Sequence, residues 1–141
     1  MNLTQWLLLP LFIHLVVLTY VALRNLGGRI QSVRSGKTRL KAIALDNSNW
    51  PDELRKFGNN YSNQFELPTL WYALCGLLVA TARVDAVAVA LSWAFVVARI
   101  AHAFIHINSN FVPNRMYAFL ASYVVLMAMW GWFGLRLFFL G

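Results

Sequence analysis

Four stretches of this 141-residue chain are long and apolar enough to cross a lipid bilayer as helices. We expect them at about residues 4–25, 60–82, 85–107 and 114–140. About 20 helical residues span a hydrocarbon core of ~30 Å. Backbone groups in lipid need partners inside the protein, which a helix supplies, and the alternation typical of a barrel is missing. The sequence therefore predicts an all-α, integral membrane four-helix bundle that forms a single domain over residues 1–141.

The overall composition also indicates a membrane protein. Hydrophobic residues make up 60% of the chain and charged residues 12%, whereas soluble domains have roughly 45–50% and 25%. The first apolar stretch lacks the basic leader and small-residue cleavage site of a signal peptide, so we expect it to be a retained helix.

Basic residues are concentrated between the first two predicted helices. Eight of the twelve Lys and Arg lie from the end of the first predicted helix to residue 56, namely Arg24, Arg29, Arg34, Lys37, Arg39, Lys41, Arg55 and Lys56. The positive-inside rule makes the loop 26–58 cytoplasmic and places both termini on the opposite side. The middle of this loop, near residues 39–46, is typical of a short surface helix. The net charge of +7 sits beside membrane helices without a nucleic-acid-binding module, which favours anionic lipids over nucleic acid as partners. We expect a bacterial inner membrane protein.

Ionisable and amide side chains cluster near the cytoplasmic ends of three predicted helices. Those on one helix share a face because they are spaced three or four residues apart. They are Asn59, Asn63 and Glu66 on the second helix, Arg99, His102 and His106 on the third, and Arg115 at the start of the fourth. Charges at membrane depth usually face a cavity or one another. The pattern predicts a cationic, amide-lined pocket for a small anionic ligand, flanked by apolar surface for a lipophilic substrate.

Structural interpretations of the same residues remain open. Glu66 and Arg99 can form a buried ion pair, and Asn63 can clamp two helices together. Arg115 can simply mark the membrane interface. His14 has no polar partner nearby in the sequence and is expected to be a packed or interfacial residue. His102 and His106 have the spacing of metal ligands, with Glu66 as a third. That signal is weak, so no metal site is predicted.

Two motifs in these helices resemble those of the MAPEG family, the membrane-associated proteins in eicosanoid and glutathione metabolism. The first is Asn63-Gln-Phe-Glu66-Leu-Pro68 in the second helix. The second is Arg99-Ile-Ala-His102 in the third helix, followed by Pro113-Asn-Arg115. Four helices, a basic first loop and the chain length are also similar to the family, so the resemblance covers essentially the whole chain.

The resemblance implies a homotrimer with glutathione bound between neighbouring subunits on the cytoplasmic side. Arg115 matches the arginine that faces the glutathione sulfur and favours the thiolate, which is a catalytic role. The residues implied in glutathione binding are Asn59, Asn63, Glu66, His102, His106 and one of Arg24 or Arg29. Arg99 is implied as a structural brace. The predicted function is that of a glutathione-dependent transferase or peroxidase acting on a lipophilic electrophile.

Four positions depart from the family pattern. Asn59 and Ser62 stand where glutathione-using members commonly have basic residues, His106 replaces a tyrosine, and Met116 replaces a small polar residue. Amides cannot replace the charge that an arginine offers to a carboxylate. Two alternatives therefore stay open: an enzyme that uses another small thiol or anionic ligand, and a non-catalytic MAPEG-fold scaffold or lipid-binding protein.

Overall fold

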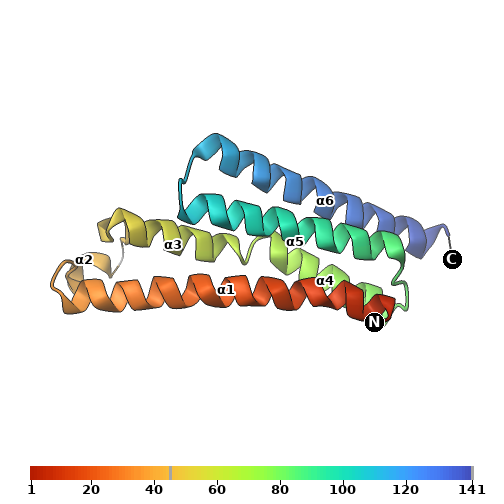
Figure 1. Ribbon diagram of the computed structural model, residues 1–141, viewed down its shortest axis with the longest axis horizontal. Coiled ribbons are helices and arrows are strands. Elements are labelled where there is room, and N and C mark those ends of the chain that lie inside the picture. The colour runs from red at the N-terminus through yellow and green to blue at the C-terminus, as the bar shows by residue number, and fades with distance from the viewer. Residues whose placement is uncertain (45, 141) are drawn as a thin grey trace.

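The computed structural model describes residues 1–44 and 46–140, and their regular structure is helical. The elements are α1 (Leu3–Arg34), α2 (Leu40–Ile43), the 3-10 helix η1 (Asn47–Asn49), α3 (Asp52–Asn63), α4 (Leu67–Ala80), α5 (Ala86–Ile107) and α6 (Val112–Phe138). The long helices form an elongated bundle, with both termini at one end and the α1–α2–α3 corner at the other (Figure 1). Leu45, in the predicted basic loop, and Gly141, at the end of the predicted domain, lie outside the described residues.

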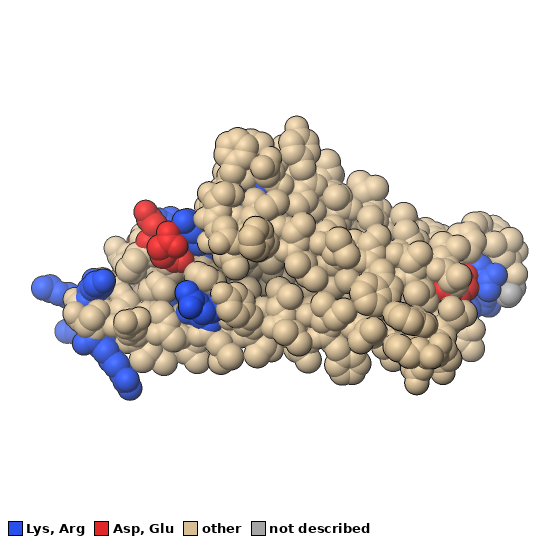
Figure 2. Space-filling model, in the orientation of Figure 1, with Lys and Arg blue, Asp and Glu red and all other residues tan. Residues whose placement is uncertain are grey.

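Three helices of the described chain, α1, α5 and α6, are long and apolar enough to cross a membrane. Large apolar side chains cover their outer surfaces, including Phe12, Val16, Val97, Phe104 and Leu120. On the face shown in Figure 2, charged side chains gather at the two ends and leave a broad uncharged middle. The all-α, membrane-spanning architecture is therefore confirmed, but with three of the four predicted spans. The remaining candidate, α4, has 14 residues, which at 1.5 Å each extend about 21 Å.

The predicted span 60–82 is broken in two by Pro68. The helix α3 ends at Asn63, and α4 begins at Leu67. Pro68 lacks the N–H that would bond to the carbonyl of Gln64, and its ring disfavours helical geometry in the preceding residue. Glu66 consequently lies in the break and not on the helix face predicted for it.

The first helix continues nine residues past its expected end at residue 25, to Arg34. Gly28 does not end the helix because it lies against α3: a Cβ there would be 2.4 Å from Leu54 Cδ2. Glycine thus permits the close approach of α1 and α3. The helix ends only before Gly36, whose φ of +73° suits glycine. Much of the expected loop 26–58 is therefore helical, in α1, α2, η1 and α3.

A proline inside α1 creates a bonding site for α5. Pro10 has no N–H to offer the carbonyl of Trp6. Trp93 of α5 supplies the donor instead, with Nε1 at 3.1 Å from the Trp6 oxygen. Beside it, Ser92 Oγ donates to the Leu7 carbonyl at 3.3 Å. Since lipid offers no replacement partner, these bonds fix the packing of α1 against α5.

At the end that carries the termini, Asp85 joins the α4–α5 turn to α6. Its carboxylate caps α5 by accepting from the Ala88 N–H at 2.8 Å. It also accepts from Trp132 Nε1 at 3.0 Å and pairs with Arg136 Nε at 3.5 Å. Arg83 donates to the Arg136 carbonyl at 2.6 Å. The bundle is thus closed at this end independently of the opposite end.

We expect Trp93→Phe to destabilise the protein by about 1 kcal/mol, because it removes the donor to the Trp6 carbonyl. In a Pro10→Ala background the new backbone N–H takes over that carbonyl, so the same change should cost measurably less. Unfolding of the four variants in a detergent titration gives the coupling between the two positions. Equal costs in both backgrounds would contradict the role assigned to Pro10.

Candidate functional site

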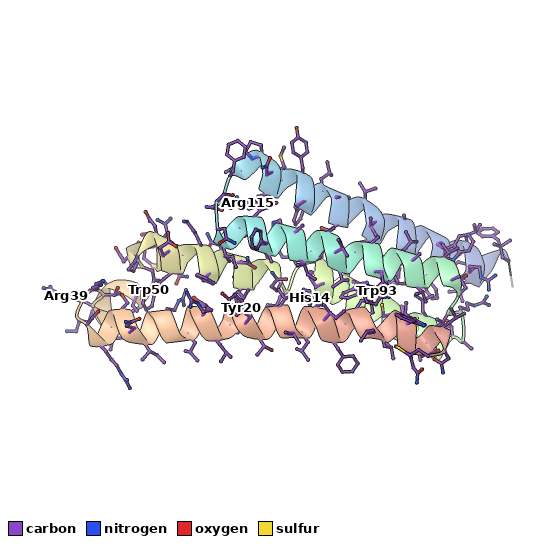
Figure 3. The ribbon with its side chains drawn as sticks, viewed as in Figure 1. His14, Tyr20, Arg39, Trp50, Trp93 and Arg115 are labelled. Atoms are coloured by element: carbon purple, nitrogen blue, oxygen red, sulfur yellow. The ribbon has the colours of Figure 1, made fainter. Side chains whose placement is uncertain are left out.

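A cavity of about 510 Å³ opens between α3, α5 and α6, toward the end of the bundle opposite the termini. Arg115, at the start of α6, marks its position in Figure 3. The residues that line it are Asn59, Ser62, Asn63, Glu66, His102, His106, Val112, Arg115, Met116 and Phe119. Six residues predicted to bind ligand or catalyse from the sequence are therefore brought to one cavity. Ser62 of α3 and Met116 of α6, noted only as departures from the family pattern, line the same cavity.

The loop between α5 and α6 positions Arg115. Asn110 adopts a left-handed φ of +49°, and its N–H caps α5 by bonding to the Ile105 carbonyl at 2.8 Å. Its side-chain oxygen accepts from Arg115 Nη1 at 2.7 Å. Asn110 thus turns the chain between the two helices and holds the Arg115 guanidinium. Arg115 lies in the first turn of α6, at the level of the last turn of α5.

The two histidines of α5 occupy successive turns of one helix face. Their ring centroids are 5.6 Å apart, and each residue is only 2% exposed. Within the described chain, Nδ1 of His102 and both ring nitrogens of His106 have no hydrogen-bond partner. Buried polar atoms are usually satisfied, so these nitrogens are free to receive a polar ligand.

Arg99 lies behind the cavity wall and supports it. The residue is fully buried, and its Nη2 donates to the Asn63 carbonyl at the end of α3, at 2.6 Å. Among the described residues no ion pair joins Arg99 to Glu66, so that alternative is wrong. Nε and Nη1 of Arg99 have no partner there either. Arg99 thus holds the last residue of α3 next to the break and adds positive charge near the cavity.

The arginines of α1 lie away from this cavity. The guanidinium carbon of Arg24 is 5.6 Å from the ring centroid of Phe57, and that of Arg29 is 4.8 Å from Trp50. Arg24 lines a separate cavity of about 460 Å³ between α1 and α3. The structure therefore does not bring Arg24 or Arg29 to the Arg115 cavity of their own chain.

In the described part of the chain, no three His, Cys, Asp or Glu residues are grouped so as to hold a metal ion. Glu66 therefore does not complete a three-ligand set with His102 and His106.

A buried hydrogen-bond network next to the site escaped the sequence analysis. His14, expected to be a packed or interfacial residue, is packed at 1% exposure; its Nε2 lies 2.9 Å from Gln64 Oε1 and its Nδ1 lies 2.8 Å from the Tyr72 hydroxyl. An amide oxygen only accepts, so Nε2 donates to Gln64 and, in the neutral ring, Nδ1 accepts from Tyr72. Gln64 donates to Asn60 Oδ1, and Asn60 donates to the Ala103 carbonyl at 2.9 Å. Figure 3 shows His14 beside the break between α3 and α4.

This network joins α1, the α3–α4 break and α5 behind the cavity. Asn60 and Gln64 are four residues apart, one position after Asn59 and Asn63. Gln64 directly follows α3 in a helical conformation, so Asn60 and Gln64 form a second amide face beside that of Asn59 and Asn63. That spacing was the available sequence signal. Buried amides in an apolar bundle need partners, and His14 is the partner that the sequence could not assign.

Comparison with models of protein families matches residues 5–135 to the MAPEG family. This chain belongs to the MAPEG family. The match runs from the first turn of α1 into the last turns of α6, and with the three apolar helices it identifies an integral membrane protein. No curated protein and no solved structure matches the chain. The family resemblance is thus confirmed for this MAPEG protein.

We expect His14→Phe to lower the free energy of unfolding by about 1–3 kcal/mol, because Gln64 Oε1 and the Tyr72 hydroxyl lose their partner in a buried place. In the His14→Phe background, Gln64→Leu should lower the free energy of unfolding by less than it does in the wild-type protein, because both changes remove the same hydrogen bond. Unfolding in detergent measures both effects. Phe12→Leu, at a side chain that is 65% exposed, is the matched α1 control, and an equal loss there would refute the importance of the network.

Proposed function

We propose that this MAPEG protein is a glutathione-dependent transferase or peroxidase that acts on a lipophilic electrophile. The observation that supports this most is the cavity of about 510 Å³, whose volume falls in the range of roughly 300–1,000 Å³ typical of small-molecule sites. It combines a cation, a carboxylate and amides with an apolar wall and two imidazoles, three of whose ring nitrogens are buried without a partner among the described residues.

The functional groups of glutathione have a counterpart in this cavity. Glu66 offers a carboxylate to the ligand's ammonium group, while Asn59, Asn63 and His102 offer hydrogen bonds to its carboxylates and peptide groups. Arg115 is assigned to the thiol. A guanidinium in a poorly hydrated site favours the anionic form of a nearby thiol. The thiolate, and not the thiol, is the nucleophile that attacks an electrophile.

The second substrate reaches the cavity from the bilayer in this proposal. Val112, Met116 and Phe119 form the apolar part of the lining. The adjoining outer surface of α6 exposes Tyr117 and Leu120. A lipophilic molecule dissolved in the membrane can thus approach the thiolate without crossing water.

We further propose a homotrimer in a bacterial inner membrane, with the basic end in the cytoplasm, where glutathione is dissolved. The charge distribution supports this orientation, because Arg34, Lys37, Arg39 and Lys41 lie at the end of α1, in α2 and in the turn between them, and Lys and Arg side chains gather at that end of the molecule (Figure 2). In such an assembly Arg24 and Arg29, which lie away from their own chain's cavity, contact ligand only in the cavity of a neighbouring copy.

A non-catalytic scaffold or lipid-binding role is the second candidate. It is favoured by Asn59 and Ser62, which line the cavity where the family pattern has basic residues. An enzyme that uses another small thiol or anion at the same site is the remaining alternative. Unlike the main proposal, neither alternative predicts that the protein binds glutathione as a thiolate.

Titration of the detergent-purified protein with glutathione should produce a saturable ultraviolet thiolate band. Arg115→Ala should abolish the band, because no other cation lines the cavity among the described residues. Arg39→Ala changes an exposed arginine outside the cavity and should leave the band intact. A protein that gives no band at millimolar glutathione would exclude the glutathione proposal and favour the alternatives.

Asn59→Arg should strengthen glutathione binding by about 10- to 100-fold, because a charge-assisted hydrogen bond to a carboxylate contributes roughly 1.5–3 kcal/mol. Asn59→Gln, which lengthens the side chain without adding charge, is the matched control and should change affinity little. Calorimetry of both variants gives the comparison. Equal affinities would mean that position 59 does not meet a carboxylate of the ligand.

A further inference from the structure

His106 is the cavity residue whose bonding capacity is least satisfied. The residue is only 2% exposed. Both of its ring nitrogens are therefore shielded from solvent, yet neither has a hydrogen-bond partner within the described chain. A neutral imidazole has one N–H donor and one nitrogen lone pair. His106 therefore presents a free proton acceptor at the wall of the cavity.

The α5–α6 hairpin places this acceptor next to the arginine assigned to the thiol. His106 lies in the last turn of α5, and Arg115 lies in the first turn of α6, across the short loop that Asn110 organises. His102 lies one turn deeper along α5, about 6 Å away along the helix axis. Its ring is 5.8 Å from that of Phe119. His106 is thus the histidine at the level of Arg115.

The cavity needs a proton acceptor if it is to form a thiolate without releasing a proton to water. Arg115 favours the anion but stays protonated itself, so it cannot take the thiol proton. The charged and titratable groups around His106 are Glu66 from the α3–α4 break, Arg99 and His102 from α5, and Arg115 from α6. Of these, Glu66 is assigned to the ligand's ammonium group, which leaves the histidines.

We propose that His106 accepts the proton of the thiol that binds beside Arg115, an inference that rests on the proposed glutathione function. The S–H bond breaks, its electron pair stays on sulfur, and a new N–H bond forms on the imidazole of His106. The thiolate then lies between imidazolium and guanidinium. When its sulfur bonds to the electrophile, the leaving group departs with the electron pair of its own bond and takes the proton from His106. The sum is a thioether and the protonated leaving group.

The test counts the protons released for each thiolate formed when glutathione binds. Calorimetry in two buffers of different ionisation enthalpy gives the proton release, and the ultraviolet band of the same samples gives the thiolate. The wild-type protein should release almost no protons, since His106 keeps the one lost by sulfur, whereas His106→Gln should release about one proton per thiolate or bind glutathione without forming thiolate. His102→Gln is the matched comparison: it should weaken glutathione binding, because His102 lines the cavity, but at saturating glutathione it should still release almost no protons per thiolate.

The outcomes distinguish a failure of the role proposed for His106 from a failure of the proposed glutathione function. Release of one proton per thiolate by the wild-type protein itself overturns the role of His106, and this measurement needs no variant. Unchanged proton retention in His106→Gln, or its loss in His102→Gln instead, also overturns it. His106→Tyr, a bulkier ring that cannot accept the proton as imidazole does, gives the same comparison if the glutamine variant fails to fold. Absence of any glutathione binding to the wild-type protein would instead refute the glutathione function itself.

Discussion

The hydrogen-bonded chain from His14 through Gln64 and Asn60 to the Ala103 carbonyl determines where the other parts of this bundle lie. Polar groups buried in a membrane protein need protein partners, because lipid offers none. The interruption caused by Pro68 would otherwise leave the end of α3 free to shift. Asn60 and Gln64 are held between α1 and α5. Their bonds fix the rotation of α3 about its axis and the position of Glu66 in the break that follows.

That constraint accounts for the composition of the cavity wall. Asn59 and Asn63 each precede a network residue by one position, so they turn away from α1 and toward α6. Arg99, which belongs to α5 like Ala103, also fixes the last residue of α3 through the Asn63 carbonyl. The α5–α6 hairpin then adds Arg115, held by Asn110. Internal bonds therefore hold the framework, while Nδ1 of His102 and both ring nitrogens of His106 have no partner in the described chain and can meet a ligand.

The sequence predicted the apolar helices and the grouping of six site residues well, because both depend on features that repeat along one helix. It failed where the outcome depends on contacts between helices. The first helix was expected to end at residue 25, yet α3 packs against Gly28 and α1 continues to Arg34. Pro68 was used as part of a motif, but its effect was to break the helix and move Glu66 into the break. The partner of His14 lies 50 residues away in the chain, at Gln64, which no spacing rule reveals.

We propose that the ligand binds between α3, α5 and α6, in front of the helix break that the His14 network holds. Hydrogen–deuterium exchange of the protein in nanodiscs, with and without saturating glutathione, tests this most directly. We expect slower exchange on binding around residues 59–66 and 108–116, at the break and at the α5–α6 loop. Protection confined to the α1–α3 groove near residues 23–31, or no protection at all with bound glutathione, would contradict the account.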